Sequence, residues 1–187
     1  EKKGKIDLLV LTHIDSDHID GILRLFSNQD FDFSIIEQMW FNFGERLFNS
    51  LQIDGLYKKI NLYERDTKIS WRQGEDLEEI LQRTGIIRKL PIVSPGCHFV
   101  GGAKLTVLSP NVEILKEFAD KDDEECARTT HIAYCCDYEK SVTELHEKEF
   151  EGIVSLTNRS SIAFLFEFSG KKLLLLGDAE DNTIKNY

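Results

Sequence analysis

Four side chains that commonly bind divalent metal ions lie within one short run of this sequence. The run reads THIDSDHIDG, and its candidate ligands are His13, Asp15, Asp17 and His18. Imidazole and carboxylate groups that converge on one point can hold a divalent ion while a coordination position stays open for water. Two neighbouring ions lower the pKa of a bridging water and hold the attacking and leaving oxygens of a hydrolysis together. The run therefore predicts a metal-dependent hydrolytic site.

The same residues also have a purely structural interpretation. A polar turn before a helix would use Asp17 as its N-cap and leave both histidines in solvent. That interpretation is favoured for any one of these residues alone. It is less favoured for all four together between a buried strand and Gly21, so the metal site is the leading hypothesis.

The segments around the run predict how its side chains are positioned. Residues 6–11 are nearly continuous in Ile, Leu and Val, which is typical of a buried strand. From His18 onward, apolar residues recur at helical spacing, so a helix is expected to begin near that residue. Ligands that follow the carboxyl end of a strand stand where open α/β sheets place their active sites.

The rest of the chain predicts a single α/β domain that covers residues 1–187. Further strands are expected at 35–41, 86–92, 104–108, 162–168 and 172–176, and further helices at 46–60, 75–84, 112–118 and 179–184. Ser169 and Gly170 are expected to join the last two strands in a hairpin. An insertion is expected at 120–151, which begins with an acidic run, or more widely around 111–157.

Composition and charge restrict the function classes. The formal net charge is −10, which argues against a broad phosphate-binding surface and against an anionic membrane as partner. A nuclease is still allowed, because bound metal ions can supply positive charge where a phosphodiester must lie. No apolar stretch approaches the roughly 20 residues needed to cross a bilayer, and the N-terminus does not resemble a signal peptide, so a cytoplasmic location is expected.

Several other side chains have both a functional and a structural interpretation. Trp40 and the aromatic residues near it could stack nucleic-acid bases, although their spacing is more typical of a core. Arg159 could contact a phosphate or simply face solvent. The remaining histidines are expected in the core or on the surface rather than as ligands, and the cysteines as free buried thiols; they are His98, His131, His146, Cys97, Cys126, Cys135 and Cys136.

The ligand run resembles the HxHxDH signature of the metallo-β-lactamase-fold hydrolases, including the glycine usual in that turn. Its departure from the signature is Asp15, which stands where the family most often has its second histidine. The resemblance implies that His13 and Asp15 bind a first metal ion, and that Asp17 and His18 bind a second. It also implies the four-layer αββα sandwich of that family.

The C-terminal part of the chain resembles the same family. LLLLGDAE is similar to the strand that delivers the family's bridging carboxylate, so the resemblance makes Asp178 the bridge. Residues 158–161 and the hairpin after them resemble one branch, the hydrolase domain of the ComEC-type DNA-uptake proteins, in which N-x-x-S precedes this hairpin. Many other members of the family carry a histidine-bearing segment before this hairpin, and Asn158 lies close to the position of that histidine. Asn158 and Ser161 are therefore candidate substrate-binding residues, with hairpin caps as the alternative.

The resemblance also implies parts of the site that these residues do not include. An opening hairpin is expected before Glu1, and a final histidine-bearing segment is expected after Tyr187. The sandwich is therefore expected to be incomplete at both ends, and the metal site to be partial.

The leading functional hypothesis is hydrolysis of a phosphoester, with a nucleic-acid phosphodiester as the preferred substrate. Two divalent ions would generate a hydroxide, Asp178 would bridge them, and Asp17 would bind metal and steer the nucleophile. The oxygen-rich ligand set suits Mn²⁺, with Zn²⁺ and Mg²⁺ as further candidates. Two alternatives stay open: a hydrolase of the same fold acting on a nucleotide, lactone or thioester, and a non-catalytic scaffold domain with a decayed site. A protein partner or a homo-oligomer fits each hypothesis, but no residue identifies one.

Overall fold

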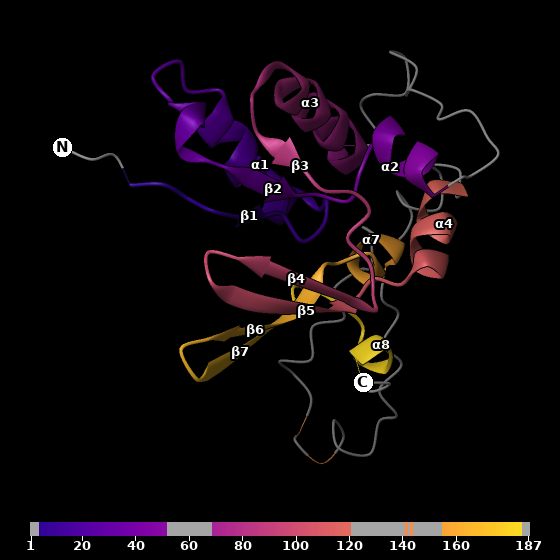
Figure 1. The fold of residues 1–187 in the computed structure, drawn as a ribbon. Coiled ribbons are helices and arrows are strands. Elements are labelled where there is room, and N and C mark those ends of the chain that lie inside the picture. Colours follow the sequence, from indigo (N-terminus) through magenta and orange to yellow (C-terminus); the bar gives the residue numbers. More distant parts are fainter. Residues whose placement is uncertain (1–3, 52–68, 121–140, 142, 144–154, 185–187) are drawn as a thin grey trace.

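Two β-sheets organise the part of the chain that the computed structural model describes, which is residues 4–51, 69–120, 141, 143 and 155–184 (Figure 1). The first sheet is parallel, with the strand order β1 (Leu9–Val10), β2 (Gln38–Trp40) and β3 (Ile87–Arg88). The second sheet is antiparallel, with the order β4 (Gly96–Val100), β5 (Ala103–Ser109), β6 (Ala163–Phe168) and β7 (Lys171–Leu175). The predicted mixed α/β class is confirmed.

Helices cover the parallel sheet on the face away from the antiparallel one (Figure 1). The longest two are α1 (Ser16–Phe26) and α3 (Ile69–Arg83), which contact each other. The apolar stripe of α1 buries Ile19 and Phe26, as its helical periodicity predicts. Shorter helices that add side chains to the same core are α2 (Glu45–Ser50), α4 (Val112–Asp120) and α7 (Leu156–Arg159). None of the helices in the described segments is long and apolar enough to cross a membrane.

Side chains that alternate between the two faces of the parallel sheet contribute to two separate cores. Leu9 and Met39 pack with the helices, whereas Val10 and Trp40 pack against the antiparallel sheet. Successive side chains of a strand point to opposite faces, so a strand buried on both faces is apolar throughout. Trp40 is fully buried and meets Phe164 of β6 edge-on, with ring centroids 5.7 Å apart. It is therefore a core residue and not a platform for bases.

These cores give three layers in the order helices, parallel sheet and antiparallel sheet. On the antiparallel sheet, the one-turn helix α8 (Asp181–Ile184) contacts β5, and it does not by itself make a fourth layer. The four-layer sandwich expected from the sequence therefore stays a prediction beyond these three layers.

Most predicted elements are present, but the parallel strands are shorter than expected. The strand expected at 6–11 is reduced to β1 and an isolated bridge between Ile6 and Ile36. The strand expected at 35–41 begins only at Gln38, because residues 33–35 form a 3₁₀ turn that Asp32 caps through the Ser34 N–H. The strand expected at 86–92 stops at Arg88, shortly before Pro91, which has no N–H for a ladder.

The helices and the insertion also needed correction. Helix α3 already includes residues 69–74, ahead of the predicted start at residue 75, because Trp71 packs against Phe43 and Phe118 in the core. The helix expected at 46–60 appears as α2, and residues 52–60 lie outside the described part. At the two ends of the wider expected insertion, around 111–157, α4 and Leu156 pack in the main core. The narrower insertion at 120–151 lies almost entirely outside the described residues.

The antiparallel sheet differs from the prediction at its edges. Strand β4 was not predicted, because the exposed Cys97 and Phe99 do not give it a clean apolar face. The thiol of Cys97 is exposed, whereas a buried thiol was expected. The other three cysteines lie outside the described residues. The predicted hairpin between β6 and β7 is confirmed, with positive φ at Ser169 and Gly170. Its second strand, β7, is the edge of the sheet, and its leucines are exposed.

Of the three histidines expected in the core or on the surface, the structure describes His98, and its packing confirms that interpretation. The ring of His98 packs against Trp40 with centroids 4.9 Å apart. Burial lowers the pKa of His98, and the positive charge of Lys89 lowers it further. His131 and His146 lie outside the described residues.

A buried ion pair ties the parallel sheet to α3. The Arg88 guanidinium of β3 donates to the Glu78 carboxylate of α3, and it also donates to the backbone carbonyls of Phe41 and Phe43. The two side chains are only 2% and 9% exposed. Burial lowers the pKa of Arg88, while Glu78 opposes that shift. Removing one partner would leave the other as an uncompensated buried charge.

We therefore predict that Glu78→Ala destabilises the fold by roughly 3–5 kcal/mol, because it leaves the buried Arg88 charge without a partner. The matched control is Glu79→Ala on the same helix, where the carboxylate faces Arg83 and both side chains are largely exposed. That control should cost less than about 0.5 kcal/mol. Urea denaturation followed by circular dichroism measures both values, and equal losses would contradict the structural role of the pair.

Candidate metal centre

The ligand run follows β1 directly and turns into α1. The N–H of Leu11 donates to the Trp40 carbonyl at 3.0 Å, which extends the β1–β2 alignment to the start of the turn. Helix α1 then begins at Ser16, and its N-cap residue is Asp15 rather than Asp17. The Asp15 side chain makes no capping hydrogen bond. Its carboxylate therefore does not satisfy the helix end, as a typical N-cap would, and is left to face His13.

A third ligand group comes from the other sheet. After β7 the chain passes Leu176 and Gly177 and presents Asp178 to the two histidines. His13, His18 and Asp178 offer ligand atoms that all lie within 4.8 Å of one another. Because Gly177 has a φ of +54° and a Cβ there would lie 3.0 Å from the Thr12 Cβ, glycine allows this close approach. The structure thus brings together the three predicted ligands that are furthest apart in the sequence.

The ligand atoms form two groups that share Asp178. In the first group, His13 Nε2 lies 3.6 Å from Asp15 Oδ2 and 3.9 Å from Asp178 Oδ2. In the second group, His18 Nε2 lies 3.8 Å from Asp17 Oδ2 and 3.6 Å from Asp178 Oδ1. The two oxygens of one carboxylate therefore face different histidines. The assignment of these two groups to two metal ions, which the sequence resemblance implied, stays a prediction.

These distances fit divalent metal ions. Ligand atoms bound tetrahedrally to one ion at 2.0–2.2 Å are roughly 3.3–3.6 Å apart. The measured separations are at or slightly above that range, so small side-chain rotations would complete the coordination. His13 Nε2 is also buried and has no hydrogen-bond partner among the described residues, although buried polar atoms normally have one. A metal ion would satisfy that nitrogen.

Exposure changes steadily across the centre. The His13 side chain is fully buried, His18 is 29% exposed, and Asp178 is 41% exposed. Asp17, at the outer edge, is 81% exposed. The centre therefore has a buried histidine as its floor and a carboxylate at its rim, and a bound ion would be reached from the Asp17 side.

The predicted substrate-binding residues occupy less accessible positions. Ser161 is fully buried; its hydroxyl lies 3.1 Å from His13 Nδ1 and accepts from the Asp178 N–H at 3.3 Å. That position is behind the ligands, where the hydroxyl orients them, whereas a substrate contact would require exposure. Asn158 lies in α7, and its buried Oδ1 has no hydrogen-bond partner among the described residues. Its contact with substrate stays a prediction.

Two side chains near the centre, Arg159 and Thr12, make contacts that the sequence did not predict. The Arg159 guanidinium pairs with Glu117 and Glu180, each at 3.3 Å. These two carboxylates already neutralise the positive charge that a phosphate contact would use. Thr12 had no predicted role, yet its hydroxyl lies 3.0 Å from His13 Nδ1. In the sequence, the one sign of this contact is that Thr12 precedes a candidate histidine ligand, and that sign is weak.

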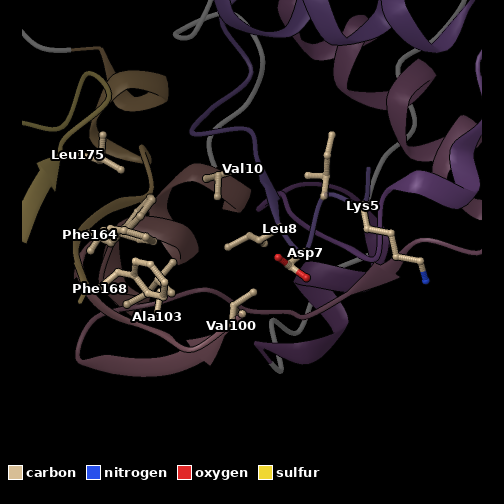
Figure 2. Close-up of a pocket in the computed structure, with 13 residues that line it drawn as sticks. Lys5, Asp7, Leu8, Val10, Val100, Ala103, Phe164, Phe168 and Leu175 are labelled. Atoms are coloured by element: carbon tan, nitrogen blue, oxygen red, sulfur yellow. The ribbon is translucent and has the colours of Figure 1, made fainter. Parts of the chain in front are cut away.

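A cavity of about 410 Å³ lies between the two sheets, away from these ligands (Figure 2). Figure 2 shows Leu8 and Val10 on one side of it and Phe164, Phe168 and Leu175 on the other. The lining is mostly apolar, with the charges of Lys5 and Asp7 at one end. Hydrolysis of a polar substrate needs convergent polar groups, which the His13–Asp178 cluster has and this cavity lacks. The cluster is therefore the better candidate site.

Fold and site together define a mixed α/β protein with a candidate centre of two histidines and flanking carboxylates. In comparisons with known proteins, no family model matches this chain and no curated protein is significantly similar to it.

The approach of Gly177 to Thr12 gives a testable consequence for stability. Alanine at Gly177 or at Gly170 must adopt a positive φ, at about 1–2 kcal/mol each. Only Gly177→Ala also meets a neighbour, since no atom lies within 4 Å of a Cβ at Gly170. We predict an additional loss of about 1–3 kcal/mol for Gly177→Ala, measured by urea denaturation. Equal losses for the two variants would show that the Thr12–Gly177 contact is not tight.

Proposed function

We propose that this chain is a metal-dependent hydrolase with a metallo-β-lactamase-like fold, and that its preferred substrates are phosphodiesters, nucleic acid among them. The observation that carries the proposal is the division of the ligand atoms into two groups with Asp178 common to both. Two ions a few ångströms apart are the usual arrangement for displacement at phosphorus. The placement of the ligands at strand ends that meet between two packed sheets supports the four-layer αββα assignment.

Each ligand has a distinct role in the proposed centre. His13 and Asp15 would hold one divalent ion, His18 and Asp17 would hold the other, and Asp178 would be available to both. When bound, the two ions make water a nucleophile at neutral pH and neutralise the charge of a phosphate. The buried His13 fixes the inner position, because its ring cannot move into solvent. The exposed Asp17 carboxylate can accept a hydrogen bond from an incoming water and steer it toward the substrate.

The overall charge supports a role for the ions in substrate binding. The chain has a formal net charge of −10 and three carboxylates in the centre itself. A phosphodiester would be repelled by that field unless cations were bound between them. The same centre can act on a nucleotide, lactone or thioester. A substrate panel of single-stranded DNA, RNA, bis-p-nitrophenyl phosphate, a lactone and a thioester separates these classes, and turnover of none of them with metal bound would favour the scaffold alternative.

Loss of a ligand should abolish turnover. We predict that Asp17→Ala and His18→Ala each lower the rate on bis-p-nitrophenyl phosphate by roughly 100-fold or more, because each removes metal-ion stabilisation of the transition state. The matched control is Asp20→Ala on the same helix, where the carboxylate pairs with Arg24 at 2.7 Å. Far-UV circular dichroism should show that all three variants are folded. Retained activity in both ligand variants would refute the proposal.

The ligand set also predicts metal preference. Three carboxylates and two imidazoles form an oxygen-rich set, which suits Mn²⁺ better than a histidine-rich set would. We expect metal-free protein reconstituted with Mn²⁺ to be at least as active as protein reconstituted with Zn²⁺, with Mg²⁺ as a third arm of the assay. Asp15→His, which restores the more common ligand, is the matched variant and should shift preference toward Zn²⁺. Activity of the unaltered chain with zinc alone would contradict this prediction.

A further inference from the structure

Thr12 lies where the two sheets meet the ligand run. Its backbone carbonyl accepts a hydrogen bond from the Ile162 N–H at 2.9 Å, just before β6. Its side chain packs against Gly177, the residue before Asp178. Its position is therefore fixed from both sides, independently of the histidine that follows it.

The Thr12 hydroxyl is close to both candidate histidine ligands. Thr12 Oγ1 lies 3.0 Å from Nδ1 of His13 and 3.4 Å from Nδ1 of His18. The two imidazole rings are tilted against each other, with centroids 4.1 Å apart and planes inclined by 49°. A hydroxyl oxygen has two acceptor lone pairs, so one threonine can accept an N–H from each ring.

Both histidines turn their other nitrogen toward carboxylates. Nε2 of His13 faces Asp15 and Asp178, and Nε2 of His18 faces Asp17 and Asp178. A neutral imidazole carries its proton on one nitrogen only, and the nitrogen without the proton has the lone pair that binds a metal. An acceptor at Nδ1 therefore selects the form in which Nε2 is a ligand.

We infer that Thr12 is a positioning residue that holds both imidazoles in the Nδ1–H form and aims both Nε2 lone pairs at the shared carboxylate, Asp178. The inference rests on the proposed function, because it takes the two histidines to be metal ligands. It adds a residue that touches no substrate and acts through the ligands. Thr12 also couples the two groups of the centre, since one hydroxyl orients one ligand of each.

The two histidines should depend on Thr12 to different extents. His13 Nδ1 has a second hydroxyl, that of Ser161, at 3.1 Å. For His18 Nδ1, Thr12 supplies the one hydrogen bond found within the described segments. Removing the Thr12 hydroxyl should therefore release His18 while His13 keeps an acceptor.

Thr12→Val removes the hydroxyl but keeps the branched shape that packs on Gly177, and Thr12→Ser keeps the hydroxyl. Thr106→Val on β5 makes the same change away from the centre and is the matched control. Zinc affinity of the full chain, measured by competition with a chromophoric chelator, should fall roughly 10–100-fold in Thr12→Val. Thr12→Ser and Thr106→Val should stay close to the unaltered chain.

Long-range ¹H–¹⁵N spectra of the metal-free chain, with both imidazoles neutral, report the tautomers directly. We expect both histidines in the Nδ1–H form in the unaltered chain, and a shift of His18 alone toward the Nε2–H form in Thr12→Val. Equal zinc affinity in Thr12→Val, or an Nε2–H form of His18 in the unaltered chain, would overturn the inference. Zinc binding without hydrolysis of any substrate would instead refute the proposed function and leave the role of Thr12 intact.

Discussion

A backbone hydrogen bond joins the two halves of the centre at the start of the ligand turn, and neighbouring side-chain contacts depend on this alignment. The Ile162 N–H of the β6 segment donates to the Thr12 carbonyl at 2.9 Å, which brings the antiparallel sheet to the start of the ligand turn. Gly177 can then pack against the Thr12 side chain, and Asp178 reaches the histidines. The apolar layer between the sheets, built around Trp40 and similar side chains, stabilises this contact by burial from water.

The charges of the centre favour a bound cation at this position. Three carboxylates surround two imidazoles in a chain that is already strongly acidic, and the inner imidazole is fully buried. Like charges that gather around one centre repel one another, and a buried polar nitrogen without a partner is costly. A divalent ion would offset both costs. The carboxylate at the N-cap of α1 is consistent with this, because Asp15 faces His13 and does not cap the helix.

Local pattern predicted the parts of the site that depend on nearby residues. The order of strand, ligand turn and helix could be predicted, because the periodicity of residues 6–26 changes within that stretch. The proximity of Asp178 came from a family resemblance, since no local pattern brings two distant segments together. Exact strand lengths, β4 and the buried place of Ser161 depend on tertiary packing, which a single sequence does not display. Thr12 was missed for the same reason: its role exists only once His18 folds back over it.

We propose that His13, His18 and Asp178 bind metal together with their neighbouring carboxylates. Anomalous scattering from crystals of the full chain, soaked in Mn²⁺ and measured at the manganese absorption edge, would locate bound ions. We expect two peaks, one in contact with His13 and one in contact with His18, both adjacent to Asp178. A map with no anomalous peak between these three side chains would contradict this proposal.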